Sequence, residues 1–508
     1  MVQCSVSWVW HRKEPGMNDP ARDPRTPNVV LICCDHLRSD WLGCNEHPIV
    51  MTPQIDELAY EGINFRQAFS EVPVCVPARR IMMTGKDRYG VHMNINRDLQ
   101  PFPEGPKLAE TMTAAGYQTF AAGKLHTCPQ RNCIGFEDVQ LNEEGRKQGG
   151  LLKDDYEAFL DDHGYAHLAY THGLGNNEYG LRLSPLPEPY TTTHWTAQRA
   201  MEFIDRRDPT RPFFLHISFD KPHPPITPPE SYYDLYRDIE FPTPVRGDWV
   251  DQKLPTRVRY LQLKNNFDDW RDHPLVIQQS LRGVAAMITH IDSMIGVFLG
   301  HLREHRLLDN TLVIFVSDHG DQLFDHGNLA KGDFFRGSTN VPFIVRPPRA
   351  WARDHGFEFG QIDNRSPVAL RDIMPTILDI YGVEIPDSVD GQSLVPLMLG
   401  QPEAFRSHTC GNCGVVYGVS DGETKYMWFS DDDCEFLFDL QGDPRDMHDL
   451  AEDPLWRPKL EQQRQRLVEW MAQHGDPHVE SGMLKSSPAD WDLTWARAST
   501  VWNNRGRH

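Results

Sequence analysis

Apolar, strand-like runs alternate with helix-like segments along most of this chain, and this alternation limits the possible folds more than any other feature. The run Val29–Cys34 has no polar residue, which predicts a strand buried on both faces. Further strands are expected at 63–69, 117–122, 212–219, 311–317 and 341–345, and helices at 52–62, 107–116, 192–207, 275–305 and 371–381. We therefore predict an α/β fold with a large mixed, mostly parallel sheet sandwiched by helices.

The pattern changes after about residue 400. Short runs bounded by turns, at 414–417 and 425–429, predict a small antiparallel sheet, and a charged helix is expected at 457–474. The expected organisation is an N-terminal extension at 1–26, a catalytic α/β domain at 27–400, a small C-terminal α+β subdomain at 401–479 and a tail at 480–508. The polar, Pro-rich stretches 141–190 and 226–275 predict long loops that build a binding face.

The charge balance excludes two classes of partner. The chain has 51 Lys+Arg against 72 Asp+Glu, a net charge of −21, whereas nucleic acid and anionic membranes both require a basic surface. No apolar run approaches the roughly 18–20 residues that span a bilayer. The N-terminus lacks the basic start, apolar stretch and cleavage site of a secretory signal, so we expect a cytoplasmic protein.

The cysteines predict free thiols and no disulfide scaffold. There are only 10 cysteines in 508 residues, and adjacent Cys33 and Cys34 lie within the first predicted strand. Cys410 and Cys413 form a single C-x-x-C, which is half of a zinc site. We predict two unliganded thiols there.

Four groups of polar residues follow predicted strands. Ligands of open α/β sheets bind beyond the carboxyl ends of the strands, so these groups are expected to converge on one site. The four segments are Asp35–Asp40, Cys75–Gly85, Gly123–His126 and Ser317–Asp321.

Two of these segments have the same layout, a carboxylate followed by an imidazole. Asp35-His36 and Asp318-His319 would suit a divalent cation such as Ca²⁺, Mg²⁺ or Mn²⁺. Either aspartate alone could equally cap the helix that follows. The repeated layout favours a metal site.

Cys75 and the cations that follow the strands are candidates for chemistry on an anion. A cysteine at a helix start near Arg79 could be an activated nucleophile, although a buried structural cysteine is the commoner case. Lys124 and His126 alternate along an extended backbone, so both can face one cleft and bind and protonate an oxyanion. Further cations, each of which also has a plain surface interpretation, are Lys221, His223, His326 and Lys331.

Taken together, these motifs resemble the type I sulfatases of the alkaline phosphatase superfamily, from about Pro27 to Ala451. The most specific match is C-x-P-x-R followed by Thr-Gly, present as Cys75-Val76-Pro77-Ala78-Arg79 with Thr84-Gly85. Other matching segments are 116–119, 123–126, 317–321, 325–327, 331–332, 341–345, 390–394, 437–440, 443–444 and 449–451. The chain departs from the family at Ala78, usually Ser, and at His36, commonly a second Asp. An imidazole there makes Mn²⁺ or Mg²⁺ more plausible beside Ca²⁺.

The resemblance implies the cofactors. A separate formylglycine-generating enzyme would oxidise Cys75 to formylglycine, and the gem-diol of that aldehyde would attack the sulfur of a sulfate monoester. One divalent metal ion, Ca²⁺ first and Mn²⁺ or Mg²⁺ as alternatives, would be held by Asp35, His36, Cys75, Asp318 and His319.

The resemblance also implies the residue roles. Asp318 would take the proton of the attacking oxygen and Arg79 would orient the diol. Lys124 and Lys331 would hold the anionic oxygens, while His223 would protonate the leaving alcohol. His126 would deprotonate the second hydroxyl. The implied substrate-binding residues are Lys124, His223, His326 and Lys331.

Two other functions compete with a sulfatase acting on small-molecule or carbohydrate sulfate esters. A phosphonate monoester hydrolase or phosphodiesterase of the same superfamily would share the modified cysteine and the metal, but Lys124 with His126 resembles sulfatases. A catalytically inactive binding protein would be expected to have lost Cys75, Lys124 or Asp318, and none is lost.

The tail bears on assembly. Its Trp491, Trp495 and Trp502 are costly to leave in water, so they pack either on their own subunit or on a neighbour. We expect the second, and with it a homo-oligomer.

Overall fold

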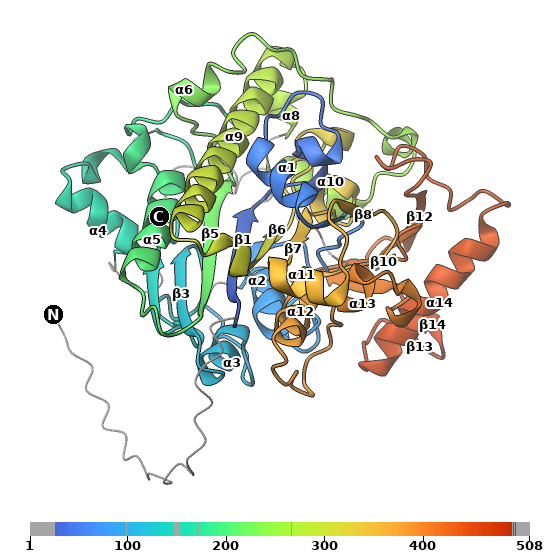
Figure 1. Ribbon diagram of the computed structural model, residues 1–508. Coiled ribbons are helices and arrows are strands. Elements are labelled where there is room, and N and C mark those ends of the chain that lie inside the picture. Colours follow the sequence, from blue (N-terminus) through green and yellow to red (C-terminus); the bar gives the residue numbers. More distant parts are fainter. Residues whose placement is uncertain are drawn as a thin grey trace.

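An eight-stranded sheet forms the centre of the molecule (Figure 1). The computed structural model describes residues 26–97, 99–146, 153–169, 172–265, 267–489, 491 and 493. In spatial order the strands are β4 (Asp138–Leu141), β3 (Gln118–Gly123), β5 (Phe213–Pro222), β1 (Asn28–Asp35), β6 (Thr311–Ser317), β7 (Phe343–Arg346), β2 (Ile63–Phe65) and β8 (Gln361–Asp363). Within this sheet only β7 runs against the other strands, so the predicted mixed, mostly parallel sheet is confirmed.

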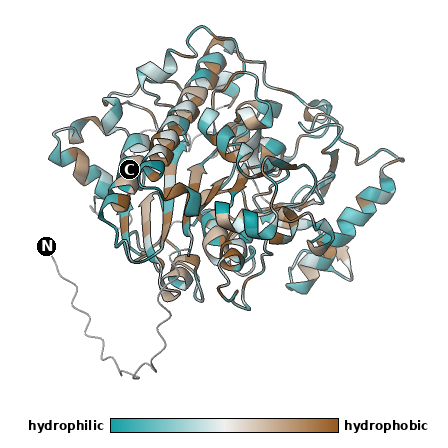
Figure 2. Cartoon of the chain, in the orientation of Figure 1, coloured by the Kyte–Doolittle hydropathy of each residue, from teal (hydrophilic) through white to brown (hydrophobic). Residues whose placement is uncertain are grey.

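Helices cover both faces of the sheet because side chains alternate along its buried strands. Val30 and Ile32 of β1 face the core under α1 (Pro53–Tyr60), α5 (Thr192–Arg206) and α9 (Pro274–Glu304). Val29 and Leu31 face the opposite core, under α2 (Cys75–Thr84), α3 (Leu108–Ala114) and α12 (Ile373–Ile380). Figure 2 shows the hydrophobic colour concentrated along the strands and on the inward sides of these helices.

Two strands differ from the sequence-based expectation. The strand predicted at 63–69 ends at Phe65, because the chain then leaves the sheet and Phe69 makes only isolated bridges, with Asn340 and Ala369. Strand β4 was not predicted, and it adds the outermost pairing to β3. Two of its four positions, Asp138 and Gln140, are polar, so β4 lacks the continuous apolar run that identifies the central strands.

The stretches predicted as long loops contain short helices, which corrects that expectation. In 141–190 the helix α4 (Asp155–Asp162) begins with a capping box, in which Asp154 accepts from the Glu157 N–H and Glu157 from the Asp154 N–H. In 226–275 lie α6 (Glu230–Tyr233), α7 (Thr256–Lys264) and α8 (Phe267–Trp270).

Helix α9 is the one described helix that is long and apolar enough to cross a membrane. In its most apolar window 78% of the residues are buried inside the protein, where α9 packs on β5 and α5. That burial is what a core helix requires.

The C-terminal region confirms the predicted small antiparallel sheet. Its strands are β9 (Thr409–Cys413), β10 (Val416–Ser420), β11 (Thr424–Phe429) and β12 (Cys434–Asp439), followed by α14 (Arg457–Gln473). Cys410 packs in the core under α14, whereas Cys413 packs in the core of the large sheet. Residues three apart on a strand point to opposite faces, and both thiols are free.

The described part of the tail folds back on its own chain. The ring of Trp491 lies 4.7 Å from that of Tyr260, and its indole N–H donates to Asp431. Trp495 and Trp502 fall outside the described residues, so the homo-oligomer remains a prediction, as do the domain boundaries.

A buried ion pair ties the small sheet to the large one. Lys425 of β11 donates to Asp446 over 2.6 Å, Asp446 also accepts the backbone N–H of Arg336, and the lysine and aspartate are almost fully buried. We expect Lys425→Met to lower the free energy of unfolding by about 3–5 kcal/mol, because Asp446 keeps a buried, uncompensated charge.

Urea unfolding would measure this effect. A control is Lys459→Met, which removes one of two cations paired with Asp421 and lies at a more exposed position. It should cost at most about 1 kcal/mol. Equal losses for the two variants would contradict a structural role for the buried pair.

Candidate active site

The predicted site residues gather at the carboxyl edge of the four parallel strands β1, β3, β5 and β6. Asp35 is the last residue of β1, Lys124 follows β3, His223 follows β5 and Asp318 follows β6. Gly123 allows β3 to lie close to β5. Its φ is +101°, and a Cβ at this position would lie 2.0 Å from the carbonyl oxygen of Ser218. Parallel strands thus bring four distant segments together, as their positions in the sequence predicted.

Four buried donors form the centre of the site: Asp35, Cys75, Asp318 and His319 place one potential ligand atom each within 4.8 Å of one another. The Cys75 sulfur lies 3.2 Å from Nε2 of His319 and 3.6 Å from Oδ1 of Asp35. Nε2 of His319 is 3.5 Å from Oδ1 of Asp318. Two carboxylates, an imidazole and a sulfur around one point suit a divalent cation.

Cys75 begins helix α2, where the chain places it against the cations of the site. Burial alone would raise the pKa of this thiol. Lys331, Lys124 and His319, together with a hydrogen bond from His126, outweigh burial and hold the pKa well below its usual value.

Arg79 connects the donors to the strands. Its guanidinium donates to Asp318 over 2.9 Å, to the Lys124 carbonyl over 2.7 Å and to the Ser218 hydroxyl over 2.8 Å. Nη2 also lies 3.5 Å from Asp35. Arg79 therefore fixes both carboxylates and joins α2 to the ends of β3 and β5.

The two central carboxyl groups have opposite pKa shifts. Burial and Cys75 oppose ionisation of Asp35, but Lys124, His223 and Arg79 prevail and lower its pKa. Burial and the charge of Asp35 raise the pKa of Asp318 against the effect of His319 and Arg79. Two neighbouring carboxylates that repel each other are expected to separate in this way.

His36 has an unusual backbone and an unused ring nitrogen. Its φ of 76° lies in the left-handed region, and its N–H donates to Asp318 over 3.3 Å. The ring lies between those of His223 and His319, at centroid distances of 4.7 and 4.8 Å, and its buried Nε2 makes no hydrogen bond. His36 also shares a potential ligand group with Asp35 and His223, so the ring borders the four central donors.

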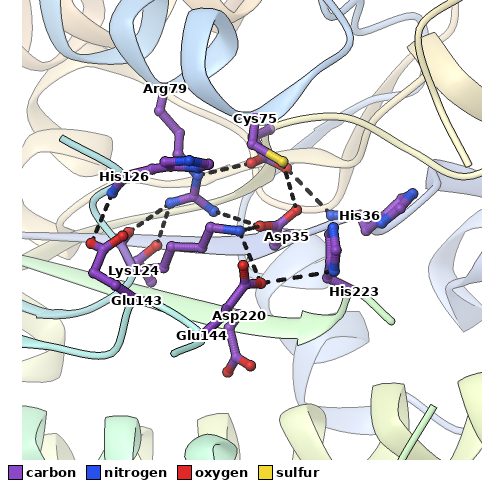
Figure 3. A network of polar contacts seen from close by, with 12 residues as sticks. Asp35, His36, Cys75, Arg79, Lys124, His126, Glu143, Glu144, Asp220 and His223 are labelled. Carbon is purple, nitrogen blue, oxygen red and sulfur yellow. Dashed lines mark hydrogen bonds and ion pairs between the residues drawn. The ribbon is translucent and has the colours of Figure 1, made fainter. Parts of the chain in front are cut away.

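Lys124 and His223 meet at Glu144, a residue that sequence reasoning missed (Figure 3). Nζ of Lys124 pairs with Asp35 and, over 2.9 Å, with Oε1 of Glu144. The same oxygen lies 3.8 Å from Nδ1 of His223. Glu144 lies beyond the carboxyl end of β4, as Lys124 lies beyond that of β3, so recognition of β4 as a strand would have been the signal for it.

His126 is held by two other residues that were missed. Glu143 accepts the backbone N–H of His126 over 2.9 Å, and Arg146 lies against the ring, 2.8 Å from Nδ1. The Arg146 guanidinium also pairs with Glu144 over 2.8 Å. The turn 143–146 thus carries two carboxylates and a cation into the site.

The remaining predicted cations have different positions. Nζ of Lys331 lies 3.5 Å from Nδ1 of His36, at the centre, whereas Lys221 donates to the carbonyl oxygens of His223 and Pro225. His326 accepts the Gly247 N–H and packs on Trp249. None of the described contacts of His326 reaches the four central donors, so its substrate-binding role stays a prediction.

A cleft begins beside these residues. Its wall includes Glu144 and Lys221 from the site, Tyr156 and His172 from the 141–190 stretch, and His290 from α9. The predicted contribution of that stretch to a binding face is consistent with this cleft.

Comparisons with known proteins identify the family of the chain. The sulfatase family profile matches residues 27–383, and the N-sulphoglucosamine sulphohydrolase C-terminal profile matches 324–473. An arylsulfatase of Clostridium perfringens is 32% identical over 481 residues, which are 91% of this chain and 98% of that protein. A choline-sulfatase of Rhizobium meliloti is 28% identical, covering 84% of this chain and 83% of that protein.

Solved structures agree on the fold. The phosphonate monoester hydrolase of Agrobacterium radiobacter superposes with a TM-score of 0.71 at 24% identity, over 88% of this chain and 96% of that one. A structure in complex with its substrate D-glucosamine-2-N,6-O-disulfate superposes with a TM-score of 0.69 at 21% identity, over 89% and 99%. The chain belongs to the sulfatase family of the alkaline phosphatase superfamily and is a sulfuric ester hydrolase.

Proposed function

We propose that this enzyme hydrolyses sulfate monoesters of aryl or carbohydrate alcohols, with a formylglycine made from Cys75 and one divalent cation. The observation that carries the proposal is Cys75 itself. It lies in an intact C-x-P-x-R segment, with Asp35, Asp318 and His319 within reach of one ion. A formylglycine-generating enzyme in the cytoplasm of the host would complete the site.

The residues present fit a divalent ion. Two buried carboxylates and the imidazole of His319 are suitable ligands, and the ring of His36 shares a second potential ligand group with Asp35 and His223. Oxygen ligands suit Ca²⁺ or Mg²⁺, whereas an imidazole ligand brings Mn²⁺ into range. When bound, the ion would polarise the sulfate ester and favour deprotonation of the nucleophilic oxygen at position 75.

Lys124 and Lys331 are the groups that bind the sulfate oxygens. They approach Cys75 from the end of β3 and from the segment after β6, and both favour negative charge at its sulfur. Charge that shifts between these oxygens in the transition state is stabilised by cations fixed beforehand. Asp35 and Glu144 hold Nζ of Lys124 in place.

His223 is placed to protonate the leaving alcohol. Its Nδ1 lies 2.6 Å from the Pro224 carbonyl oxygen, so Nδ1 carries a proton. Nε2 is therefore the atom that would deliver a proton to the alcohol. Oε1 of Glu144 lies 3.8 Å from Nδ1, on the side of the ring that faces away from this atom.

His126 would accept a proton in the second half of the reaction. Its ring already hydrogen-bonds Cys75, the position of the reacting group, and the Arg146 guanidinium lies against the same ring. Asp318 would accept the first proton, with Arg79 holding its other oxygen.

We expect sulfate monoesters to be hydrolysed in preference to phosphonate monoesters with the same aryl leaving group. Lys124 and His126 favour the sulfate, and both lie at the reacting position in the structure. The measurement is kcat/KM for each ester of a matched pair. A phosphonate or phosphodiester preference of about a hundredfold, roughly 2.7 kcal/mol in barrier, would instead support the alternative hydrolase.

A further inference from the structure

Three cations extend from the reactive centre along helix α7. Lys331 lies at the centre, Arg257 is near the start of α7 and Lys264 is its last residue. Arg257 and Lys264 are seven residues apart, two helical turns, and so share one face of the helix. Among the described residues, none of the three cations forms an ion pair with a carboxylate.

Arg257 is close to the residues that surround the reaction. A Cβ on Gly332 would lie 3.2 Å from Nη2 of Arg257 and 3.7 Å from a methyl group of Val74. Gly332 follows Lys331, and Val74 precedes Cys75. The guanidinium therefore lies one residue along the chain from the lysine proposed to bind sulfate.

Two aromatic rings hold the Arg257 guanidinium without satisfying its donors. Its central carbon lies 5.6 Å from the Tyr260 ring centroid and 5.5 Å from that of Trp491. Its Nε is buried without a hydrogen-bond partner. Contact with aromatic faces orients a guanidinium and leaves its planar edge for a carboxylate or a sulfate.

Lys264 adds a second positive charge beside Arg257. The side chain keeps access to solvent, while the surrounding protein, Arg257 and Lys331 lower its pKa. Like charges on one face of a helix repel each other, and an anion bound by both would offset that repulsion.

Three nearby acids already have other hydrogen-bond partners. Asp432 accepts from Thr256 and Asp431 accepts from Trp491. Asp333 is electrostatically coupled to Arg257, but its two oxygens accept hydrogen bonds from Gln322 and Asn328. Burial raises its pKa to about 7, so its charge is only partly available. Among the described residues, Arg257 and Lys264 thus keep charges that no ion pair neutralises, on a protein whose net charge is −21.

We propose that Arg257 and Lys264 bind a second anionic group of the substrate, a carboxylate or a further sulfate, while Lys331 and Lys124 hold the sulfate that is cleaved. This inference rests on the proposed sulfatase function and assigns its substrate class: sulfate esters of molecules that carry another negative charge. Part of the 226–275 stretch, helix α7, then determines specificity.

The test compares two sulfate esters that differ in one charge, 3-carboxyphenyl sulfate and 3-carbamoylphenyl sulfate. The ratio of their kcat/KM values, carboxylate over amide, is expected to exceed one after correction for leaving-group basicity. Arg257→Gln and Lys264→Gln should each lower this ratio about tenfold, the size of one charge-assisted hydrogen bond. The matched control is Arg259→Gln on the same helix, whose guanidinium already pairs with Asp268 over 2.7 Å. It should leave the ratio unchanged.

The outcomes separate this inference from the proposed function. If the kcat/KM ratio is the same in the wild type and in both variants, there is no second anion site. The same conclusion follows if the variants lose kcat/KM equally on both esters. If neither ester is hydrolysed, the sulfatase proposal fails, and calorimetry then decides the inference. Benzene-1,3-disulfonate should bind more tightly than benzenesulfonate, and Lys264→Gln, at a solvent-accessible position, should remove the difference. Equal binding of the two probes would refute the site.

Discussion

Cys75→Ala is expected to lower kcat/KM for an aryl sulfate by at least about 10⁴-fold, the scale on which covalent nucleophiles matter. The position is buried at the start of α2, and its thiol faces three cations and His126. Alanine lacks the thiol that the maturation enzyme would convert to an aldehyde, so no gem-diol oxygen can form at this position. The remaining cations would still bind the sulfate, so KM should change far less than kcat.

Peptide mass spectrometry of protein from a host with the maturation enzyme should show residue 75 as formylglycine or its hydrate. Cys410→Ala is the matched control, a buried free thiol in the C-terminal sheet that should leave turnover intact. Circular dichroism would establish that both variants fold. Full activity of Cys75→Ala would exclude the proposed nucleophile.

The centre of the fold and most of the site could be predicted because the signals are local. Val29–Cys34 is apolar throughout, because a strand that is buried on both faces requires apolar side chains on both. Asp35 marks the carboxyl end of this strand. The same logic located Asp318 after β6 and Lys124 after β3. Parallel pairing of β1 with β5 and β6 then brought these ends together, which no single segment could specify.

What could not be predicted depends on weak or non-local signals. Strand β4 is an edge strand with alternating polar residues, so its end and Glu144 were not recognised. Glu144 matters only because Lys124 and His223 arrive from other strands. Arg257 and Lys264 looked like ordinary charges in a polar stretch. Their lack of partners became visible only when α7 was placed against Gly332 and Trp491.

Removing the divalent ion is expected to abolish turnover, and Asp318→Asn should weaken metal binding by about 10–100-fold or more. Asp318 is fully buried, with one oxygen held by Arg79 and the other facing His319. An amide cannot supply the negative charge that two neighbouring cations, the ion and Arg79, require. Calorimetric titration of chelator-treated protein with Ca²⁺ and Mn²⁺ would measure stoichiometry and affinity without relying on activity.

The control for the metal experiment is Asp292→Asn. Asp292 is a buried carboxylate too, but it accepts the Gln54 and Ile55 N–H groups at the start of α1, away from the four donors. It should keep one ion per chain. His36→Asp adds a test of selectivity: replacing an imidazole by a carboxylate beside the donors should shift preference from Mn²⁺ towards Ca²⁺. Unchanged affinities in both Asp318→Asn and His36→Asp would place the ion elsewhere, and activity that survives complete chelation would remove it from the reaction.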